Sequence, residues 1–494
     1  MHAALLPNGR VAFLDKVENF TQLRLSNGHY AYSAEYDPLS GRLLPLSYAT
    51  NAFCAGGAFL VDGRLVVVGG NGPLLDTDPT VGDGFDGIRY LSRINSSIYE
   101  QDWTEPGHKL ASRRWYASVQ MLPDGSVFVA SGSLNGLDPN NPANNNPTYE
   151  LLNSQGVSGG VNYPMAILER TQPIFMYPFV HLLCDGTLFV FASKSAEVFD
   201  PRTRTTSRLL PDLPGDFRTY PNTGGSVLLP LSSANGWEPE VMICGGGAYQ
   251  DIDSPTDPSC GRIRPLSSHP SWEVDSMPEG RGMVEGVLLA DGTVIWLNGC
   301  RRGAQGFGLA QDPALAALIY DPVKPLGQRW TIGASSTIPR LYHSVALLLI
   351  DGTILVAGSN PVEQPVLVPT NSTPFVTEFR VEIYTPPYLQ GANAYRRPGD
   401  ISVQIQPDRS IIITFSAPVS AKAVKISLYH GGFVTHSLHM GQRLAWLDVK
   451  GWKVGVIKQT VTAFLPPTTV APPGPYVLYV LCDGIPGIGQ IVIV

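Results

Sequence analysis

The stretch AFLVDGRLVVVGG, residues 58–70, sets the pattern of the chain. An apolar run leads into Asp62-Gly63, and a β-branched run follows it and ends in small residues. Asp-Gly between two such runs is a strong signal for a β-hairpin. Residues 58–70 are therefore expected to form two antiparallel strands joined by a tight turn.

The same sequence motif recurs through most of the chain, and its turns are spaced about 50 to 62 residues apart. A hairpin repeated at this period is typical of the four-stranded blades of a propeller, in the Kelch size range. Seven copies predict seven blades. Separate sandwich domains in series are the alternative, which the even spacing and the lack of a linker disfavour. The turns lie at Asn8, Asp62, Asp124, Asp185, Asp291 and Asp351, with a degenerate copy in residues 226–247 around Asn235.

The sequence pattern changes near Phe379. Short segments with alternating apolar and polar residues, such as SVQIQ and SIIITF, follow it. These strands are typical of an immunoglobulin-like β-sandwich. The sequence thus predicts an all-β protein with a seven-bladed Kelch-like propeller in residues 1–378 and a sandwich in residues 379–494. Helix signals are sparse, and residues 312–320 are the place where a short helix is expected.

Composition limits the possible partners. The chain has 494 residues, 15% of them charged, and a net charge of −7, so nucleic acid is not expected to bind. No apolar run approaches the ~20 residues of a membrane span. We expect a monomer. The chain begins directly on the first repeat, so we expect a natural N-terminal segment ahead of it, and a missing leader does not argue for the cytoplasm.

The low charge and three sequons favour a secreted glycoprotein. Six cysteines occur, and none forms a CxxC pair, which makes a structural zinc site improbable. If Cys54 is covalently engaged, as considered below, one of the other five is left free or pairs with a preceding segment. The sequons begin at Asn19, Asn95 and Asn371.

Four residues with metal-binding or redox side chains occupy nearly the same place in different repeats. Cys54, Tyr116 and His343 each lie eight residues before the Asp of their turn, and Tyr342 lies nine before. Equivalent positions of different blades point to a common axis, so these side chains can converge. Imidazole and phenolate donors suit Cu(II), and a bound dication can hold a phenol ionised.

Less specific interpretations remain for each residue. A Tyr-His pair at a blade edge is more often packing than ligand, and Cys54 can be an ordinary buried thiol. A second imidazole is still needed, and two candidates lie in FVTHSLHMGQR, residues 433–443. His436 and His439 face opposite sides of a strand at this spacing, so only one can reach a given metal. Spacing alone does not choose between them.

The chain resembles the copper-radical oxidases, the group that contains galactose oxidase and glyoxal oxidase. The resemblance runs over essentially the whole length and is carried by four motifs. It implies a seven-bladed propeller with a C-terminal β-sandwich, and it selects His436 over His439. The motifs are NAFCAGG at Cys54, RRWYASVQMLPDG at Tyr116, RLYHSVALLLIDG at Tyr342-His343 and FVTHSLHMGQR at His436.

The roles of these residues follow from the resemblance. It implies a thioether between Cys54 and Tyr116, with the modified Tyr116 holding a radical beside one copper ion. Tyr116, His343 and His436 are implied as equatorial ligands, and Tyr342 as the axial ligand that accepts the substrate's hydroxyl proton. A single copper needs a second redox centre for two-electron chemistry, which such a phenol can supply. O2 would then be reduced to hydrogen peroxide.

One departure from galactose oxidase and one resemblance to glyoxal oxidase bear on the substrate. Galactose oxidase has a Trp over its thioether, where this chain has Leu134, and Trp115 is a candidate to shield the radical instead. RRWY and NNPANNNPTYELL resemble glyoxal oxidase more closely, which implies oxidation of small aldehydes, as hydrates, to carboxylic acids. Arg340 is a candidate to steer an anion, with strand capping or surface pairing as alternatives. The rival functions are a primary-alcohol or galactose oxidase and a non-enzymatic Kelch-like scaffold.

Overall fold

The Asp-Gly turns form the hairpins that the repeat predicted, in a computed structural model that describes residues 1–93 and 101–494. The Asp62 carboxylate accepts a hydrogen bond from Arg64 N at 3.1 Å, and Gly63 has φ +82°. The Asp351 carboxylate likewise accepts from Thr353 N at 2.9 Å. The carboxylate closes the turn and glycine tolerates its positive φ, so this pair of residues reverses the chain.

In the described residues, seven small antiparallel sheets follow one another along the chain; four have four strands, two have three, and the first is extended from four strands to six by two strands from the C-terminal part. Their strands are β1 (His2–Leu5), β2 (Val11–Leu14), β3 (Ser33–Tyr36) and β4 (Leu43–Leu46); β5 (Gly56–Phe59), β6 (Leu65–Val68) and β7 (Ile88–Leu91); β8 (Ser118–Met121), β9 (Val127–Ala130), β10 (Thr148–Leu152) and β11 (Tyr163–Pro164); β12 (Phe179–Leu182), β13 (Leu188–Ala192), β14 (Ser195–Asp200) and β15 (Thr205–Leu210); β16 (Gly225–Leu228), β18 (Val241–Cys244), β19 (Ser259–Ile263) and β20 (Glu273–Ser276); β21 (Glu285–Leu288), β22 (Val294–Leu297), β25 (Ala316–Tyr320) and β26 (Trp330–Ser335); and β27 (Val345–Leu348), β28 (Ile354–Ala357) and β29 (Glu382–Tyr384).

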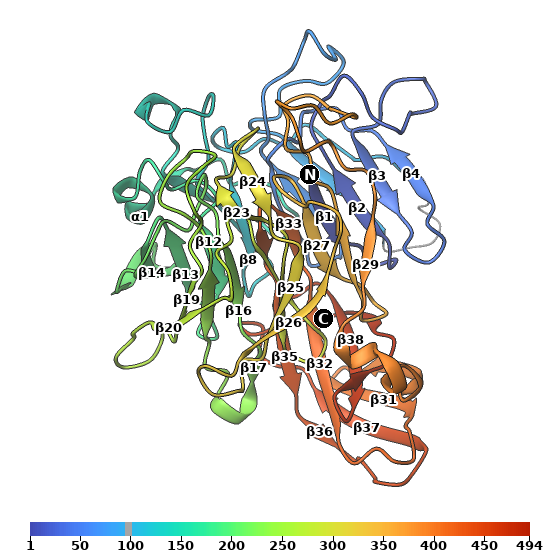
Figure 1. Ribbon diagram of the computed structural model, residues 1–494. Helices are drawn as coiled ribbons and strands as arrows, with labels where there is room; N and C mark the ends of the chain where they lie inside the picture. Colours follow the sequence, from blue (N-terminus) through green and yellow to red (C-terminus); the bar gives the residue numbers. More distant parts are fainter. Residues whose placement is uncertain (94–100) are drawn as a thin grey trace.

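A hairpin from the C-terminal part fills the centre of these sheets. Its strands are β33 (Phe433–Thr435), which pairs with β1, and β34 (Leu438–Met440). Together they contact the first strand of each of the seven sheets: β1, β5, β8, β12, β16, β21 and β27. Figure 1 shows β33 running into the middle of the upper part, beside β1 and β27. The arrangement is the predicted seven-bladed propeller, with a hairpin along its axis.

The remaining C-terminal strands form the predicted immunoglobulin-like sandwich. One sheet contains β30 (Gly399–Ile405), β31 (Ser410–Ser416), β37 (Lys458–Phe464) and β36 (Val449–Lys450). The other contains β35 (Arg443–Leu447), β32 (Val424–His430), β38 (Pro475–Cys482), β39 (Ile485–Pro486) and β40 (Gln490–Ile493), and β17 (Leu231–Ser232) of the propeller joins its edge. Apolar side chains of both sheets, including Ile413 and Leu478, share one buried cluster.

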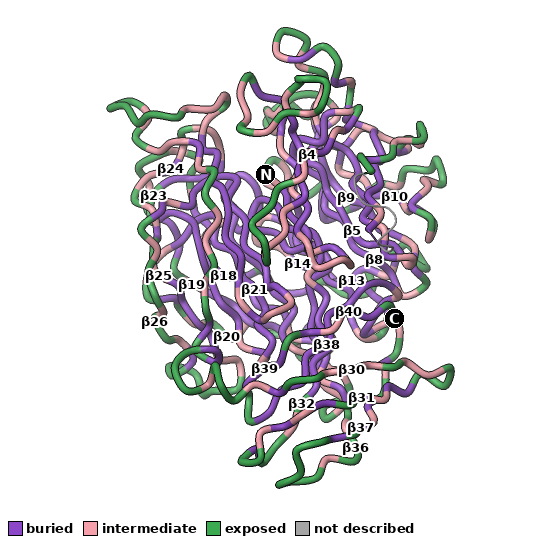
Figure 2. The backbone as a smooth tube through the Cα atoms, turned by 90° about the vertical axis from the view of Figure 1, so that its right-hand side faces the viewer, coloured by how far each residue is buried: buried purple, intermediate pink, exposed green. Residues whose placement is uncertain are grey.

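The two parts meet after β29, which pairs with β28 in the seventh sheet. This strand lies beyond residue 378, where the sequence placed the end of the propeller. The division at residues 378 and 379 stays a prediction. Figure 2 shows burial concentrated in the inner strands of the propeller and exposure in its outer loops.

The prediction of a short helix in residues 312–320 is wrong. β24 (Ala310–Pro313) and β25 (Ala316–Tyr320) occupy this stretch, and β25 pairs with both β22 and β26. The one α-helix of the described residues is α1 (Ala166–Arg170), and short 3-10 turns occur at Pro142–Asn144, Ser233–Asn235, Pro387–Leu389 and Gly391–Tyr395. Among residues 1–93 and 101–494, no helix has the length and apolar character that a membrane crossing requires.

Candidate metal and redox centre

The residues just ahead of the inner strands share an unusual backbone conformation. Cys54, Tyr116, Tyr177, Met283 and His343 have φ of +54°, +72°, +48°, +57° and +65°. Each lies eight residues before the Asp of its turn, as the sequence shows. Non-glycine residues with positive φ are strained by roughly 1–3 kcal/mol each and gather at functional sites. The repeat thus places one residue with this conformation at the same point of five blades.

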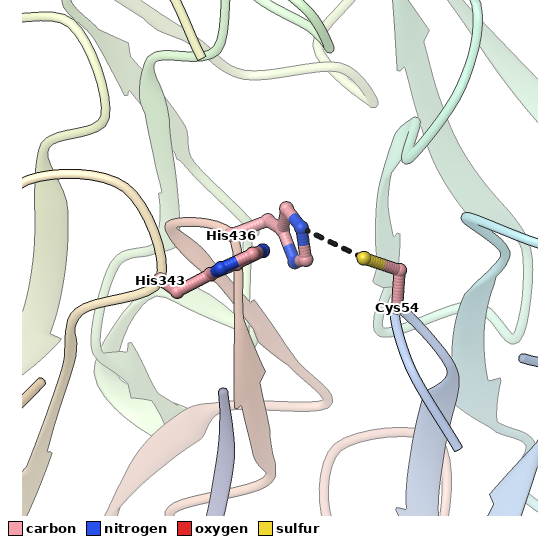
Figure 3. A group of neighbouring side chains, drawn as sticks. All are labelled: Cys54, His343 and His436. Atoms are coloured by element: carbon pink, nitrogen blue, oxygen red, sulfur yellow. Dashed lines mark hydrogen bonds between the residues drawn. The ribbon is translucent and has the colours of Figure 1, made fainter. Parts of the chain in front are cut away.

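These side chains converge with His436 from the central hairpin. The hydroxyls of Tyr116 and Tyr342 lie 2.9 Å apart, and Tyr342 Oη lies 3.3 Å from His436 Nε2. Cys54 Sγ lies 3.2 Å from the same nitrogen. Figure 3 shows Cys54, His343 and His436 reaching towards one another from three separate segments. The five residues of this centre are each at most 2% exposed: Cys54, Tyr116, Tyr342, His343 and His436.

The outer nitrogens of both histidines are held by neighbours, which leaves the inner nitrogens facing the centre. His343 Nδ1 lies 3.1 Å from the Asn360 carbonyl, and His436 Nδ1 lies 2.7 Å from Thr435 Oγ1. His343 Nε2 is buried and has no hydrogen-bond partner among the described residues. His439 points elsewhere, with Nε2 3.4 Å from the Glu285 carboxylate. The centre therefore includes His436 rather than His439.

Burial sets the protonation of the centre. It lowers the pKa of His343 and His436 well below the usual value, so both imidazoles are neutral and able to bind a metal. Burial, followed by the neighbouring Cys54 or Tyr220, raises the pKa of Tyr116 and Tyr342 well above the usual value. It also raises the pKa of the Cys54 thiol to about 12. A bound dication would reverse this effect at the phenols, because it favours the phenolate.

The donor set fits a copper ion. The candidate ligand atoms of Cys54, His343 and His436 all lie within 4.8 Å of one another. The unpartnered His343 Nε2 is a buried polar atom that a metal would satisfy. Two phenol oxygens adjoin these nitrogens, and imidazole with phenolate is a donor set that suits Cu(II).

Comparison with known protein families agrees with this geometry. Residues 1–388 match the family described as Glyoxal oxidase N-terminus, and residues 397–494 match Galactose oxidase-like, Early set domain. This chain belongs to the glyoxal oxidase family. As a member of that family it is an oxidoreductase, a copper-radical oxidase, as the sequence indicated.

Several known proteins are similar to this glyoxal oxidase family member over most of its length. Aldehyde oxidase GLOX1 of Arabidopsis thaliana is 32% identical, over 99% of this chain and 82% of that protein. Aldehyde oxidase GLOX of Vitis pseudoreticulata is 33% identical, over 99% and 94%. Galactose oxidase of Gibberella zeae is 24% identical, over 85% and 58%. A fungal alcohol oxidase solved with copper shares the fold, with a TM-score of 0.75 over 100% of this chain and 96% of that one, at 20% identity.

Of the predicted pocket residues, Trp115 lies at the centre and Leu134 does not. The Trp115 ring packs edge-on against Tyr116, with centroids 5.2 Å apart, and also contacts Phe53 and Phe85. Leu134 is half-buried, and its backbone N–H donates to the Asn144 carbonyl at 2.7 Å. Leu134 lies outside the apolar clusters of the described residues, including the one that contains Tyr116.

Arg340 is directed into the seventh sheet. Its guanidinium pairs with Glu382 of β29 at 2.7 Å and donates to the carbonyls of Gly358 and Arg380. Four other buried arginines likewise donate to the residue that follows the second strand of a sheet. They are Arg89 to Gly69, Arg114 to Ser131, Arg218 to Gly245 and Arg281 to Asn298. Arg340 thus belongs to a contact that is repeated in five of the blades and ties their strands together.

The remaining predicted positions are peripheral. Asn19 and Asn371 are exposed, and Asn95 lies outside the described residues. Cys244 and Cys260 form a disulfide across β18 and β19. Cys184, Cys300 and Cys482 are free thiols, in addition to Cys54.

Two tyrosines at the centre were missed from the sequence. Tyr177 packs against His436 and Tyr116, with centroids 4.8 and 5.0 Å away, and its place eight residues before Asp185 was the signal that could have identified it. Tyr220 packs 4.4 Å from Tyr116, and its loop precedes the degenerate repeat, where no Asp-Gly turn gives a reference point.

Proposed function

We propose that this protein oxidises small aldehydes such as glyoxal and methylglyoxal, as their hydrates, to carboxylic acids while reducing O2 to H2O2. The proposal depends on one observation above all: two phenols lie 2.9 Å apart, and one of them, Tyr342, lies 3.3 Å from His436 Nε2 and stacks on the His343 ring at 3.7 Å between centroids. In this proposal Tyr116, Tyr342, His343 and His436 hold one copper ion. The relatives named aldehyde oxidases support an aldehyde substrate.

The redox partner of the metal is proposed to be Tyr116 joined to Cys54 by a thioether. Tyr116 N donates to the Cys54 carbonyl at 3.0 Å, so the two residues are adjacent across neighbouring blades. A hydrogen bond between their side chains partly offsets the effect of burial on the Cys54 pKa. Loss of one hydrogen from each residue, taken up by an oxidant such as O2, would leave a carbon–sulfur bond, and sulfur on the ring would make Tyr116 easier to oxidise.

The residues divide the two-electron oxidation between them. A bound copper ion supplies a docking point for the substrate oxygen and an acceptor for one electron. Tyr342 Oη takes the hydroxyl proton, and the oxidised Tyr116 takes the hydrogen atom from the substrate carbon. His343 and His436 stay neutral and keep their inner nitrogens directed at the centre. Both hydrogens finally pass to O2, which leaves as H2O2.

A small substrate suits the surroundings of the centre. Phe307, a half-buried residue of the β23 (Cys300–Gly303) to β24 loop, lies with its ring 5.5 Å from Tyr342 and 5.7 Å from His343. The Phe53 ring stacks on it at 6.3 Å. These rings narrow the space beside Tyr342, which favours a two- or three-carbon hydrate over a sugar.

The decisive experiment loads the protein with copper and follows H2O2 release with glyoxal, methylglyoxal, glycerol and galactose. We expect the two aldehydes to react fastest. Tyr116→Phe should fold and bind copper but lose turnover, because it cannot form the same radical. Activity on primary alcohols with none on glyoxal would instead establish the alcohol oxidase alternative. Absence of copper binding and of the two-hydrogen mass loss of the thioether would favour a non-enzymatic scaffold.

We also propose that the protein is a secreted, glycosylated monomer. Support comes from the exposed sequons at Asn19 and Asn371 and from the Cys244–Cys260 disulfide, which is typical of oxidising compartments. Enzymatic deglycosylation followed by intact-mass measurement, together with light scattering, tests this. A mass unchanged by deglycosylation, or a dimeric mass in solution, would contradict it.

A further inference from the structure

Four aromatic rings surround Tyr116, and Tyr220 is the nearest of them. The ring centroids of Tyr116 and Tyr220 lie 4.4 Å apart at an interplanar angle of 43°. Tyr177, Trp115 and His436 lie farther away, at 5.0, 5.2 and 5.2 Å. Tyr220 therefore makes the tightest ring contact with the residue that the proposed function oxidises.

Tyr220 also faces a candidate ligand. Its ring meets that of His436 edge-on, with centroids 6.4 Å apart. The residue lies in the connection between β15 and β16, bridges to Met176, and is 5% exposed. It is thus a fixed part of the wall of the centre, supplied by a blade that contributes no candidate ligand.

Removal of this ring would admit water. Tyr220 is buried against the Tyr116 ring, and its loss would leave a void of side-chain size beside that phenol, whose hydroxyl is a polar partner for water. Leu134 does not offer an alternative cover, since it lies outside the apolar cluster of Tyr116. An oxidised phenol ring reached by water and dissolved reductants loses its radical quickly.

Building on the proposed function, we propose that Tyr220 is the positioning residue that covers the Tyr116 ring and sets how long its radical survives. Its ring excludes water from the Tyr116 ring that it packs against. Trp115 packs edge-on against the Tyr116 ring at 5.2 Å, farther away than Tyr220 at 4.4 Å.

The test measures the decay of the phenoxyl absorbance in oxidised, copper-loaded protein without substrate and without O2. Tyr220→Ala should shorten the half-life of the radical by about tenfold or more. Tyr220→Phe keeps the ring and should stay within about threefold of the wild type. Leu134→Ala is the matched control and should decay like the wild type. Intact mass should show the two-hydrogen loss of the thioether in every variant.

Wild-type decay in Tyr220→Ala, or equally fast decay in Leu134→Ala, would overturn the proposal. If Tyr220→Ala is not recovered as folded protein, Tyr220→Leu takes its place, with the same expected direction. Failure of the proposed function has a different signature: the wild type itself would then show neither phenoxyl absorbance nor the thioether mass. A wild type that has both, with decay unaffected by residue 220, would refute only the role of Tyr220.

Discussion

The centre depends on which nitrogen of each histidine is left unbound. Thr435 and the Asn360 carbonyl engage the Nδ1 atoms of His436 and His343, so each ring presents Nε2 to the two phenols. Metal-binding histidines are commonly fixed in this way by a partner on the second nitrogen. The burial that keeps both rings neutral also leaves His343 Nε2 without a partner among the described residues, which is unfavourable unless a ligand is bound there.

His436 and His439 provide a matched pair of substitutions. His436→Ala should abolish tight copper binding and turnover, because its Nε2 adjoins both Cys54 and Tyr342. His439→Ala should retain copper, since His439 faces Glu285 on the other side of the hairpin. Copper content after dialysis against a weak chelator distinguishes the two variants. Copper loss confined to His439→Ala would place the metal on the opposite face.

Glu18 makes stability depend on pH. Burial, reinforced by Asp15, raises its pKa from 4.5 to about 7, while Lys16 at 3.3 Å and Asn360 oppose the rise. Because the folded-state pKa is the higher one, the stabilisation is complete below about pH 4.5 and is lost as the pH rises to about 7. The unfolding free energy of the wild type should therefore fall over this range relative to that of Glu18→Gln.

Urea unfolding at several pH values measures this difference, with Glu363→Gln as the control at an exposed acidic residue nearby. Parallel stability curves for the wild type and Glu18→Gln would show that Glu18 titrates normally. Glu18 also links to the centre, since its carboxylate accepts a hydrogen bond at 2.5 Å from Asn360, whose carbonyl meets His343.

At this scale the sequence predicts the residues that follow the repeat and misses the others. The eight-residue offset from each turn located Cys54, Tyr116 and His343, and the same offset applies to Tyr177. His436 lies outside the repeat, so spacing could not choose it over His439. Tyr220 comes from a connecting loop whose path depends on how neighbouring blades pack, and no local pattern encodes that.

At the scale of elements, the hairpins were predictable because each turn is encoded by two adjacent residues. The Asp side chain and the glycine fix the reversal locally, independently of the rest of the molecule. Residues 312–320 failed for the opposite reason. Ala316–Tyr320 becomes β25 because it lies between β22 and β26, and this pairing overrides its local helix preference.

The buried arginines connect elements within each sheet, and Arg340 tests their role. Arg340→Gln leaves Glu382 and the carbonyl of Gly358 without their partner, so unfolding free energy should fall by about 3 kcal/mol. Arg301 is the control: its side chain is 45% exposed, and Arg301→Gln should cost less than about 1 kcal/mol. Denaturant unfolding gives both values.

Kinetics of the Arg340→Gln variant decide whether Arg340 steers an anion. If its role is structural, Arg340→Gln should change two KM values by the same factor: that for a charged aldehyde such as glyoxylate and that for neutral glyoxal. A selective rise in the KM for the anion, with little loss of stability, would show that the guanidinium reaches the substrate.

At the scale of the whole molecule, the site requires both parts of the chain. Four of its five residues come from the propeller, and the fifth lies on a hairpin that touches the first strand of each of the seven propeller sheets. The family resemblance implied that His436 joins the others. The way it does so, along the propeller axis, is a tertiary arrangement that no stretch of sequence encodes.

The position of this hairpin can be tested at Gly57, a residue of β5. A Cβ at Gly57 would lie 2.7 Å from the Phe433 ring, which is fully buried at the start of β33. Gly57→Ala should therefore displace the hairpin, at a cost of about 1–3 kcal/mol, and shift His436 away from the other proposed ligands. We expect copper affinity to fall by about tenfold, although no proposed ligand is changed.

Gly399→Ala is the control, because a Cβ there meets nothing within 4 Å. Titration with copper measures both variants. Wild-type affinity in Gly57→Ala would mean that the hairpin can shift without loss of the centre, and that the metal ligands do not depend on this packing.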